Sequence, residues 1–200
     1  MYARIKRGAS GRGITAVSED GSSFFVPKSV AEDHALTKGQ ELNEDEFEEL
    51  RDKCQLITAK QKALDLLAMR DHSISELRIK LQQRSFPEGT IETVIVYLLD
   101  KRYLDDTRFA ELWIRARLRK KPESRQLLLA GLMKKGVNQD IARNAIDTAA
   151  IDDDAIVEQA VRRFSKRNDE AQKLMQRLTR KGFPYGLVKK YVNQYFSEDE

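Results

Sequence analysis

The chain has 200 residues, of which 40% are hydrophobic and 34% charged, and its formal net charge is +4 at neutral pH. This hydrophobic content supports buried cores, whereas the charged content predicts a large surface of the kind found in extended helical proteins. A single cysteine, Cys54, excludes an internal disulfide and favours a reducing compartment. No apolar run approaches the roughly 20 residues of a membrane helix, so we expect a soluble cytoplasmic protein without membrane contact.

Residues 1–28 differ from the rest of the chain, because their apolar residues form short β-prone runs at 14–17 and 24–26. A turn sequence rich in Ser, Asp and Gly joins these runs at residues 18–22. Residues 2–6 can supply a third strand. We expect a small antiparallel β element and a short helix near residue 30, docked on the helices that follow, because an isolated hairpin is marginal in water.

A long amphipathic helix is predicted over residues 44–70. Asn43 followed by Glu46 is the pattern of a capping box. The apolar positions expected to form its buried seam are Phe47, Leu50, Cys54, Ile57, Leu64 and Ala68. On that seam Cys54 is expected to be a small core residue and not a nucleophile.

The remainder of the chain contains a helical pattern that occurs three times. The pattern is Leu77, Leu81, Arg84, Phe86, Ile91, Ile95 in the first copy, Leu128, Leu132, Lys135, Val137, Ile141, Ala145 in the second, and Leu174, Leu178, Lys181, Phe183, Leu187, Tyr191 in the third. In this alignment the first copy has one extra residue before its last helix. A Lys-Gly turn in the last two copies predicts a left-handed helix end. The sequence therefore predicts a mainly α protein: the β element over 1–42, then three tandem three-helix repeats over 43–104, 105–151 and 152–200, which form a curved array.

The segment 105–125 carries the most unusual chemistry, because it holds the only tryptophan and the densest run of basic residues. We expect a helix over 106–119 with Asp105 as its N-cap. At about 100° per residue its side chains separate into faces. Phe109, Leu112, Trp113 and Ala116 are expected to face a core, whereas Arg108, Arg115 and Arg119 form an adjacent stripe. Arg117 lies off this stripe and is expected to pair elsewhere.

The positive charge of the chain is concentrated around this helix, where residues 101–135 include eleven basic and four acidic side chains. Such a local excess suits a polyanion or an acidic protein groove, while a solvated cationic surface is the alternative. We predict a partner-binding or nucleic-acid-binding surface that has nine basic residues: Arg108, Arg115, Arg119, Lys120, Lys121, Arg125, Arg70, Arg78 and Arg84. The last three are expected on the concave side of the array.

No pattern in the sequence predicts catalysis. His34 and His72 lie in polar segments without the partners that a metal site or a catalytic triad requires, so surface or capping roles are expected. The pair Asp105 and Asp106 is explained by helix capping, and no glycine-rich phosphate loop occurs. We therefore expect no catalytic residue, no metal and no cofactor.

Several of these motifs together resemble the RecX family. They are the run ALDLLAMRDHSISELRIKL at 63–81, then Tyr103-Leu104-Asp105-Asp106, then Arg108-Phe109-Ala110 with Trp113, Arg115 and Arg117. The resemblance extends over nearly the whole chain. It is interrupted between Lys120 and Gln126, where this chain has Pro122, Glu123 and Ser124 in place of a glycine-containing link.

The resemblance implies a regulator of RecA recombinase that binds the groove of the RecA filament on DNA. It further implies inhibition of the RecA ATPase, of strand exchange and of co-protease activity, and thus control of recombination, DNA repair and the SOS response. The expected partners are the RecA filament and, more weakly, DNA, and the expected state is a monomer. A stand-alone DNA-binding helical repeat protein is the alternative, because both functions require a basic face.

Overall fold

The computed structural model describes residues 3–7, 13–165 and 170–198, and these ranges contain ten helices and one four-stranded sheet. The chain divides into two compact units, each of which is described by itself. The first unit comprises Met1–Arg70 with Leu77–Lys101, and the second comprises Asp71–Glu76 with Arg102–Glu200. Within the described ranges, no helix is both long enough and apolar enough to cross a bilayer.

The N-terminal sheet is antiparallel, as the turn signals predict. Its strands are β1 (Ala3–Arg7), β2 (Gly13–Ser18), β3 (Ser23–Pro27) and β4 (Glu41–Leu42), in the order β3-β2-β1-β4. The expected strand at 2–6 corresponds to β1, and Tyr2 lies outside the described residues. The two-residue strand β4 has no sequence signal of its own and pairs with the start of β1.

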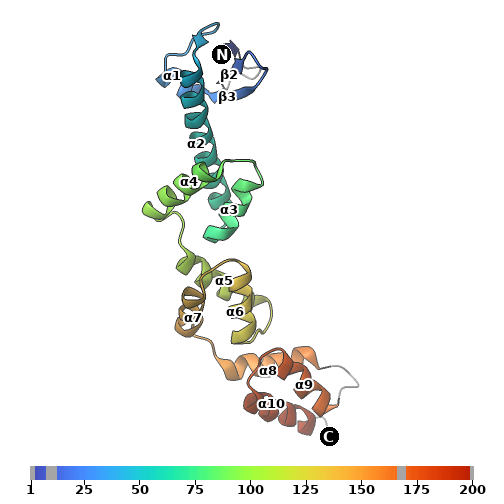
Figure 1. The fold of residues 1–200 in the computed structure, drawn as a ribbon. Coiled ribbons are helices and arrows are strands. Elements are labelled where there is room, and N and C mark those ends of the chain that lie inside the picture. Colours follow the sequence, from blue (N-terminus) through green and yellow to red (C-terminus); the bar gives the residue numbers. More distant parts are fainter. Residues whose placement is uncertain (1–2, 8–12, 166–169, 199–200) are drawn as a thin grey trace. The chain divides into compact units, whose positions relative to one another are not determined.

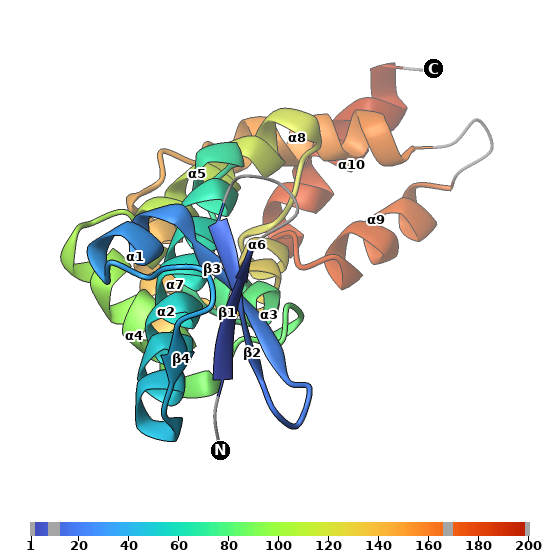
Figure 2. The same cartoon turned by 90° about the horizontal axis from the view of Figure 1, so that it is seen from above.

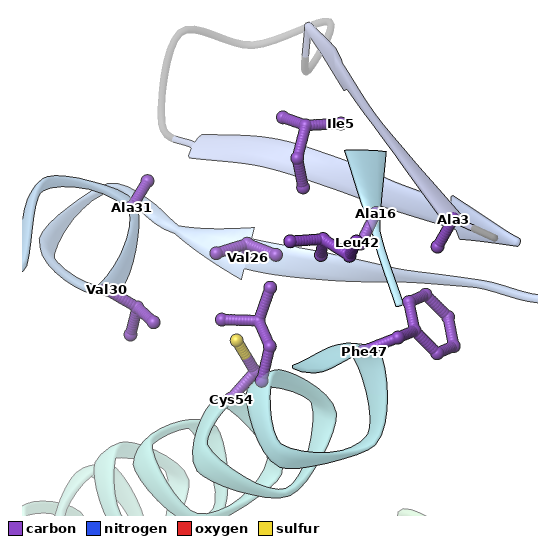
Figure 3. Close-up of a cluster of buried hydrophobic side chains, with 10 residues drawn as sticks. Ala3, Ile5, Ala16, Val26, Val30, Ala31, Leu42, Phe47 and Cys54 are labelled. Atoms are coloured by element: carbon purple, nitrogen blue, oxygen red, sulfur yellow. The ribbon is translucent and has the colours of Figure 1, made fainter. Parts of the chain in front are cut away.

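The sheet packs on one end of the long helix α2 (Glu44–Met69), and the short helix α1 (Lys28–Asp33) lies beside β2 and β3 (Figure 2). Figure 3 shows Phe47 and Cys54 of α2 pointing toward Ala16, Val26 and Leu42 of the sheet. Cys54 is buried, and this burial raises the pKa of its thiol to about 11. The expectation that Cys54 is a core residue is confirmed, and its thiol is protonated at neutral pH.

The start of α2 is the predicted capping box. The Asn43 side chain accepts a hydrogen bond from the Glu46 backbone N–H, and the Glu46 carboxylate accepts one from the Asn43 N–H, both at 2.9 Å. Together they satisfy two backbone groups that the helix itself leaves without partners.

The predicted apolar seam of α2 is correct only in its first half. Phe47, Leu50 and Cys54 are buried, but Ile57 is 41% exposed, and the buried positions further along are Ala59, Ala63 and Leu66. At 100° per residue the mean direction of this second set is turned by about 150° from that of the first. The reason is that the first half of α2 contacts the sheet, whereas α2 also packs against α4 (Glu88–Asp100). One continuous seam cannot serve two cores that lie on different sides of a helix.

The repeats form three successive helix groups (Figure 1). The first consists of the end of α2 with α3 (Ile74–Gln82) and α4; the second of α5 (Asp106–Lys120), α6 (Arg125–Lys134) and α7 (Gln139–Thr148); the third of α8 (Asp153–Phe164), α9 (Ala171–Arg180) and α10 (Tyr185–Glu198). The predicted three-helix repeats are thus confirmed.

The alignment of the copies needs one correction. The buried position after each turn is Ile91, Ala142 and Val188, and each lies fourteen residues after the first buried leucine of its copy (77 to 91, 128 to 142, 174 to 188). The first copy therefore has no extra residue. The sequence pattern suggested Ile141 and Leu187 because they are larger, but both are only partly buried.

Glycine at the turns of the second and third repeats has two physical causes. Gly136 and Gly182 have φ values of +75° and +80°, which confirms the predicted left-handed helix ends. A Cβ on Gly136 would also lie 2.2 Å from the Ser75 side chain, and a Cβ on Gly182 would lie 2.3 Å from that of Gln126. The first repeat has Ser85 at the equivalent turn, with φ of +60°.

A repeated serine contact explains why these turns lie so close to other segments. Ser73 Oγ donates a hydrogen bond to the Lys135 carbonyl at 2.6 Å, and Ser124 Oγ donates one to the Lys181 carbonyl at 2.5 Å. Each hydroxyl also accepts a bond from a backbone N–H at the start of its own helix, so that it caps the helix as well. The hydrogen bond of Ser73 therefore connects the start of α3 to the turn of the second repeat. The hydrogen bond of Ser124 connects the start of α6, in the second repeat, to the turn of the third.

We expect Gly136→Ala to lower the free energy of unfolding by roughly 2–3 kcal/mol, because a left-handed alanine costs about 1–2 kcal/mol and its Cβ also meets Ser75. Urea denaturation followed by circular dichroism measures the change. Gly89→Ala is the matched control, because Gly89 has open space around it on α4 and alanine there should stabilise by up to about 1 kcal/mol. If both variants unfold at the same urea concentration, the close approach at Gly136 is not a packing constraint.

Candidate functional site

The helix α5 begins at the predicted N-cap. The Asp105 carboxylate accepts hydrogen bonds from the backbone N–H groups of Thr107 at 2.8 Å and Arg108 at 3.1 Å. The neighbouring Asp106 is buried and accepts a bond from the Ile74 N–H at 2.8 Å, so it serves the start of α3 instead. Burial raises the pKa of Asp106 and opposes the effect of this bond. Both carboxylates thus have capping roles, but at two different helices.

The buried face of α5 differs from the predicted one. Phe109, Ala110 and Ile114 are buried against α6 and α7, and Trp113 packs against the same cluster. Leu112, which was expected in this core, is 43% exposed. At 100° per residue it lies about 40° from Arg108, so the helical spacing places it within the arginine stripe. The apolar type of Leu112 favours a core position, but its place in the helical spacing indicates the outer face.

Trp113 and Arg117 form a local structural cluster. The indole ring lies so close to Gly131 that a Cβ there would be 2.4 Å from a ring carbon, and the Arg117 guanidinium lies 5.2 Å from the centre of that ring. Trp113 is therefore a packing residue, as expected. Arg117 also donates to both carboxylate oxygens of Glu123, which confirms that it pairs away from the stripe.

Glu123 is the most deeply buried acidic side chain described, at 3% exposure. Lys121 lies 2.9 Å from its Oε1, and Arg117 Nε lies 3.0 Å from its Oε2. Burial by itself raises the pKa of this carboxyl, but the hydrogen bonds and charges of Arg117 and Lys121 outweigh burial, so the pKa is lowered. The charge of Lys121 thereby neutralises a buried carboxylate of the protein itself.

Of the three arginines in the predicted stripe, Arg108 is held by local groups. Its guanidinium lies 3.3 Å from the Asp71 carboxylate and donates to the carbonyls of Arg102 at 3.1 Å and Tyr103 at 2.9 Å. It therefore fixes the segment that leads into α5. Its predicted role in partner binding remains a prediction.

Arg115 and Arg119 are exposed, and within the described residues neither has a hydrogen-bonding or ion-pair partner. Together with Leu112 they form what we call the α5 outer face: two free guanidinium groups and one exposed apolar side chain. Arginine suits bidentate binding of carboxylate or phosphate. Lys120 is also exposed, but it lies about 100° around the helix from Arg119.

The other predicted residues lie apart from this face or have local partners. Arg125 pairs with Asp153 at 3.0 Å and donates to the Ile146 and Ile151 carbonyls. In the first compact unit, Arg78 makes a two-point contact with Glu92 at 2.7 and 2.9 Å, which raises the pKa of Arg78.

Arg84 and Arg70 also belong to the first compact unit. Arg84 lies in the turn after α3, is exposed and donates to the carbonyl of Lys80 in α3. Arg70 is exposed and has an interaction of its own. Their predicted contribution to a shared surface remains a prediction.

The histidines separate into one exposed and one buried residue. His34 is exposed, as expected, whereas His72 is only 3% exposed. Of the surface or capping role expected for His72, the surface role is wrong and the capping role stays a prediction. His72 directly precedes Ser73, whose hydroxyl binds the second repeat. The polar residues next to His72 in the sequence did not indicate this burial, because the contact of Ser73 with Lys135 joins segments 62 residues apart.

These observations define a class of protein in which tandem three-helix repeats follow a small N-terminal β-sheet along the chain. The first helix of the second repeat has a cationic face. Residues 59–98 match "RecX, first three-helix domain" and residues 105–146 match "RecX, second three-helix domain". The regulatory protein RecX of Amycolatopsis mediterranei is 33% identical over an alignment of 153 residues, which covers 70% of this chain and 86% of that protein. The chain therefore belongs to the RecX family.

Other relatives cover more of the chain. The regulatory protein RecX of Clostridium acetobutylicum is 27% identical over 188 residues, covering 88% of this chain and 87% of that protein. A crystal structure of regulatory protein RecX superposes with a TM-score of 0.68 at 22% identity, over 96% of this chain and 99% of that one. The crystal structure of RecX from Lactobacillus salivarius superposes with a TM-score of 0.59 at 23% identity, over 70% of this chain and 96% of that one. These two structures support the fold.

Proposed function

We propose that this protein regulates RecA recombinase by binding the RecA filament on DNA. Bound there, it inhibits ATP hydrolysis, strand exchange and co-protease activity, and so modulates recombination, DNA repair and the SOS response. It acts by binding and not by catalysis. Membership of a family of regulatory proteins supports this proposal.

The observation that carries the proposal is the α5 outer face. Its two free guanidinium groups can bind carboxylates, and Leu112, about one turn before Arg115, adds an apolar contact. Interfaces between proteins combine such apolar contacts with charged groups, and arginine is enriched in them. A phosphate backbone offers no apolar partner for the leucine, so this face fits an acidic protein surface better.

The test is the single-strand-DNA-dependent ATPase of RecA from the same organism, measured with increasing amounts of the chain. We expect hydrolysis to slow at less than one chain per RecA subunit, because one regulator can affect neighbouring subunits of a filament. An unchanged rate and unchanged filament length at equimolar protein would refute the proposal.

A stand-alone nucleic-acid-binding protein is the second candidate, because Arg115 and Arg119 are also suited to phosphates. The salt dependence of binding distinguishes these two candidate functions. Binding to phosphates alone weakens steeply with salt, by close to one unit in log–log slope per contact on duplex DNA. A protein interface containing Leu112 retains part of its affinity at high salt, because apolar contacts are not screened.

A further inference from the structure

The third repeat has a cationic surface that the proposed function does not use. Lys173, Arg177, Arg180 and Lys181, together with Gln176, line a hollow of about 500 Å³ along α9. No acidic side chain is among these described lining residues. By comparison, the hollow of about 390 Å³ on the N-terminal sheet is lined by two basic and two acidic side chains. The α9 hollow therefore has an excess of positive charge that is not a general property of this protein.

Two cations of this hollow contact neutral groups of Phe164. Arg177 donates to the Phe164 carbonyl at 2.6 Å, and Lys181 Nζ lies 4.9 Å from the centre of the Phe164 ring. Arg180 is exposed, and neither it nor Lys181 forms an ion pair within the part of the chain that the structure describes. Lys173 pairs with Glu170 at 3.0 Å, but both side chains are about two-thirds exposed, so this pair is weak and easily exchanged.

An apolar and aromatic hollow adjoins the cationic one. Its volume is about 670 Å³, and Gln176 and Arg180 line both hollows. Met175 and Tyr185 are among its other lining residues, and Tyr185 is 59% exposed. The exposed ring of Tyr185 is thus placed next to a row of cations on α9.

We propose that this α9 surface binds single-stranded nucleic acid, with phosphates along Lys173 to Arg180 and a base stacked on Tyr185. At 1.5 Å per residue these two cations are about 10 Å apart along the helix, which matches roughly three phosphates at about 3.4 Å each in a stacked strand. Proteins that bind single strands combine a cationic track with aromatic stacking platforms. Only an unpaired base can offer its flat face to the tyrosine ring.

The experiment measures binding of the full-length chain to a fluorescent oligo(dT), without RecA, by anisotropy at several salt concentrations. Lys173→Ala with Arg180→Ala should reduce the slope of log K against log salt by about 1.4, since a single-strand phosphate contact contributes about 0.7. Tyr185→Ala should weaken binding about five-fold or more, whereas Tyr185→Phe should retain it. Arg143→Ala, an exposed arginine on α7, is the matched control and should leave both quantities unchanged.

Three outcomes would overturn the proposal. One is an unchanged salt slope for the double variant, and another is equal binding of an abasic oligomer and oligo(dT). The third is tighter binding of polyglutamate, lost in the same variants, which would assign this surface to an acidic protein segment. Because RecA is absent from the assay, failure here leaves the proposed regulation of RecA intact, and the ATPase assay tests that regulation separately.

Discussion

Replacing Arg117 by methionine is expected to lower the free energy of unfolding by roughly 2–4 kcal/mol, because it removes one of the two cations that neutralise buried Glu123. Methionine retains an apolar contact with Trp113, so the change isolates the charge. Urea denaturation at pH 7 measures the loss. Because Lys121 still pairs with Glu123 in this variant, the loss of stability should be smaller than in a variant that removes both cations.

The pH dependence of this effect has a defined sign. The folded-state pKa of Glu123 lies below its ordinary value of 4.5, so its ionised form stabilises the protein above that value and the contribution disappears as pH falls through the folded-state pKa. The difference between wild type and Arg117→Met should therefore shrink as the pH falls through the folded-state pKa of Glu123, which lies below 4.5.

Two controls separate the buried pair from an ordinary ion pair. Adding Glu123→Gln to Arg117→Met should restore part of the stability, since no buried charge then remains. Arg162→Met removes an exposed pair with Glu158 and should cost at most about 0.5 kcal/mol. Equal losses for Arg117→Met and Arg162→Met would show that Glu123 does not depend on its partners.

Replacing Arg115 and Arg119 together by glutamine is expected to reduce binding to RecA filaments about ten-fold or more, since hydrogen bonds to charged groups contribute roughly 1.5–3 kcal/mol each. Glutamine has nearly the helix propensity of arginine, and neither arginine has a local partner among the described residues. Helical content and stability should therefore remain. Co-sedimentation with filaments measures the affinity.

The matched control for this pair is Arg143→Gln, which removes an exposed arginine from α7. It should sediment with filaments like the wild type. Arg108→Gln should instead destabilise the protein, because it removes two hydrogen bonds to carbonyls and the contact with Asp71. Loss of stability in the double variant would show that Arg115 and Arg119 have a structural role.

Local signals predicted the helix starts and the presence of the repeat correctly, although not the alignment of its last helix. Asn43 and Asp105 cap the helices that immediately follow them, and such contacts involve residues only two or three positions away. The leucine pairs of each repeat are buried for the same reason, since their four-residue spacing is a property of one helix.

Contacts between distant segments could not be predicted in this way. Ser124 binds the carbonyl of Lys181, 57 residues away, and nothing near either residue indicates the other. The rotation of the buried face along α2 likewise depends on which elements pack on each half. For the candidate site, the spacing of Arg115 and Arg119 was informative, but the commitment of Arg108 to two carbonyls required its three-dimensional surroundings.

The α5 outer face is tested most directly by placing a photo-crosslinking amino acid at Leu112, its exposed apolar side chain. The chain is irradiated on RecA filaments assembled on single-stranded DNA, and adducts are identified by mass spectrometry. We expect a covalent adduct with RecA from position 112 and none from the same probe at Arg143. Adducts with DNA alone, or equal RecA adducts from both positions, would contradict the assignment of this face to RecA.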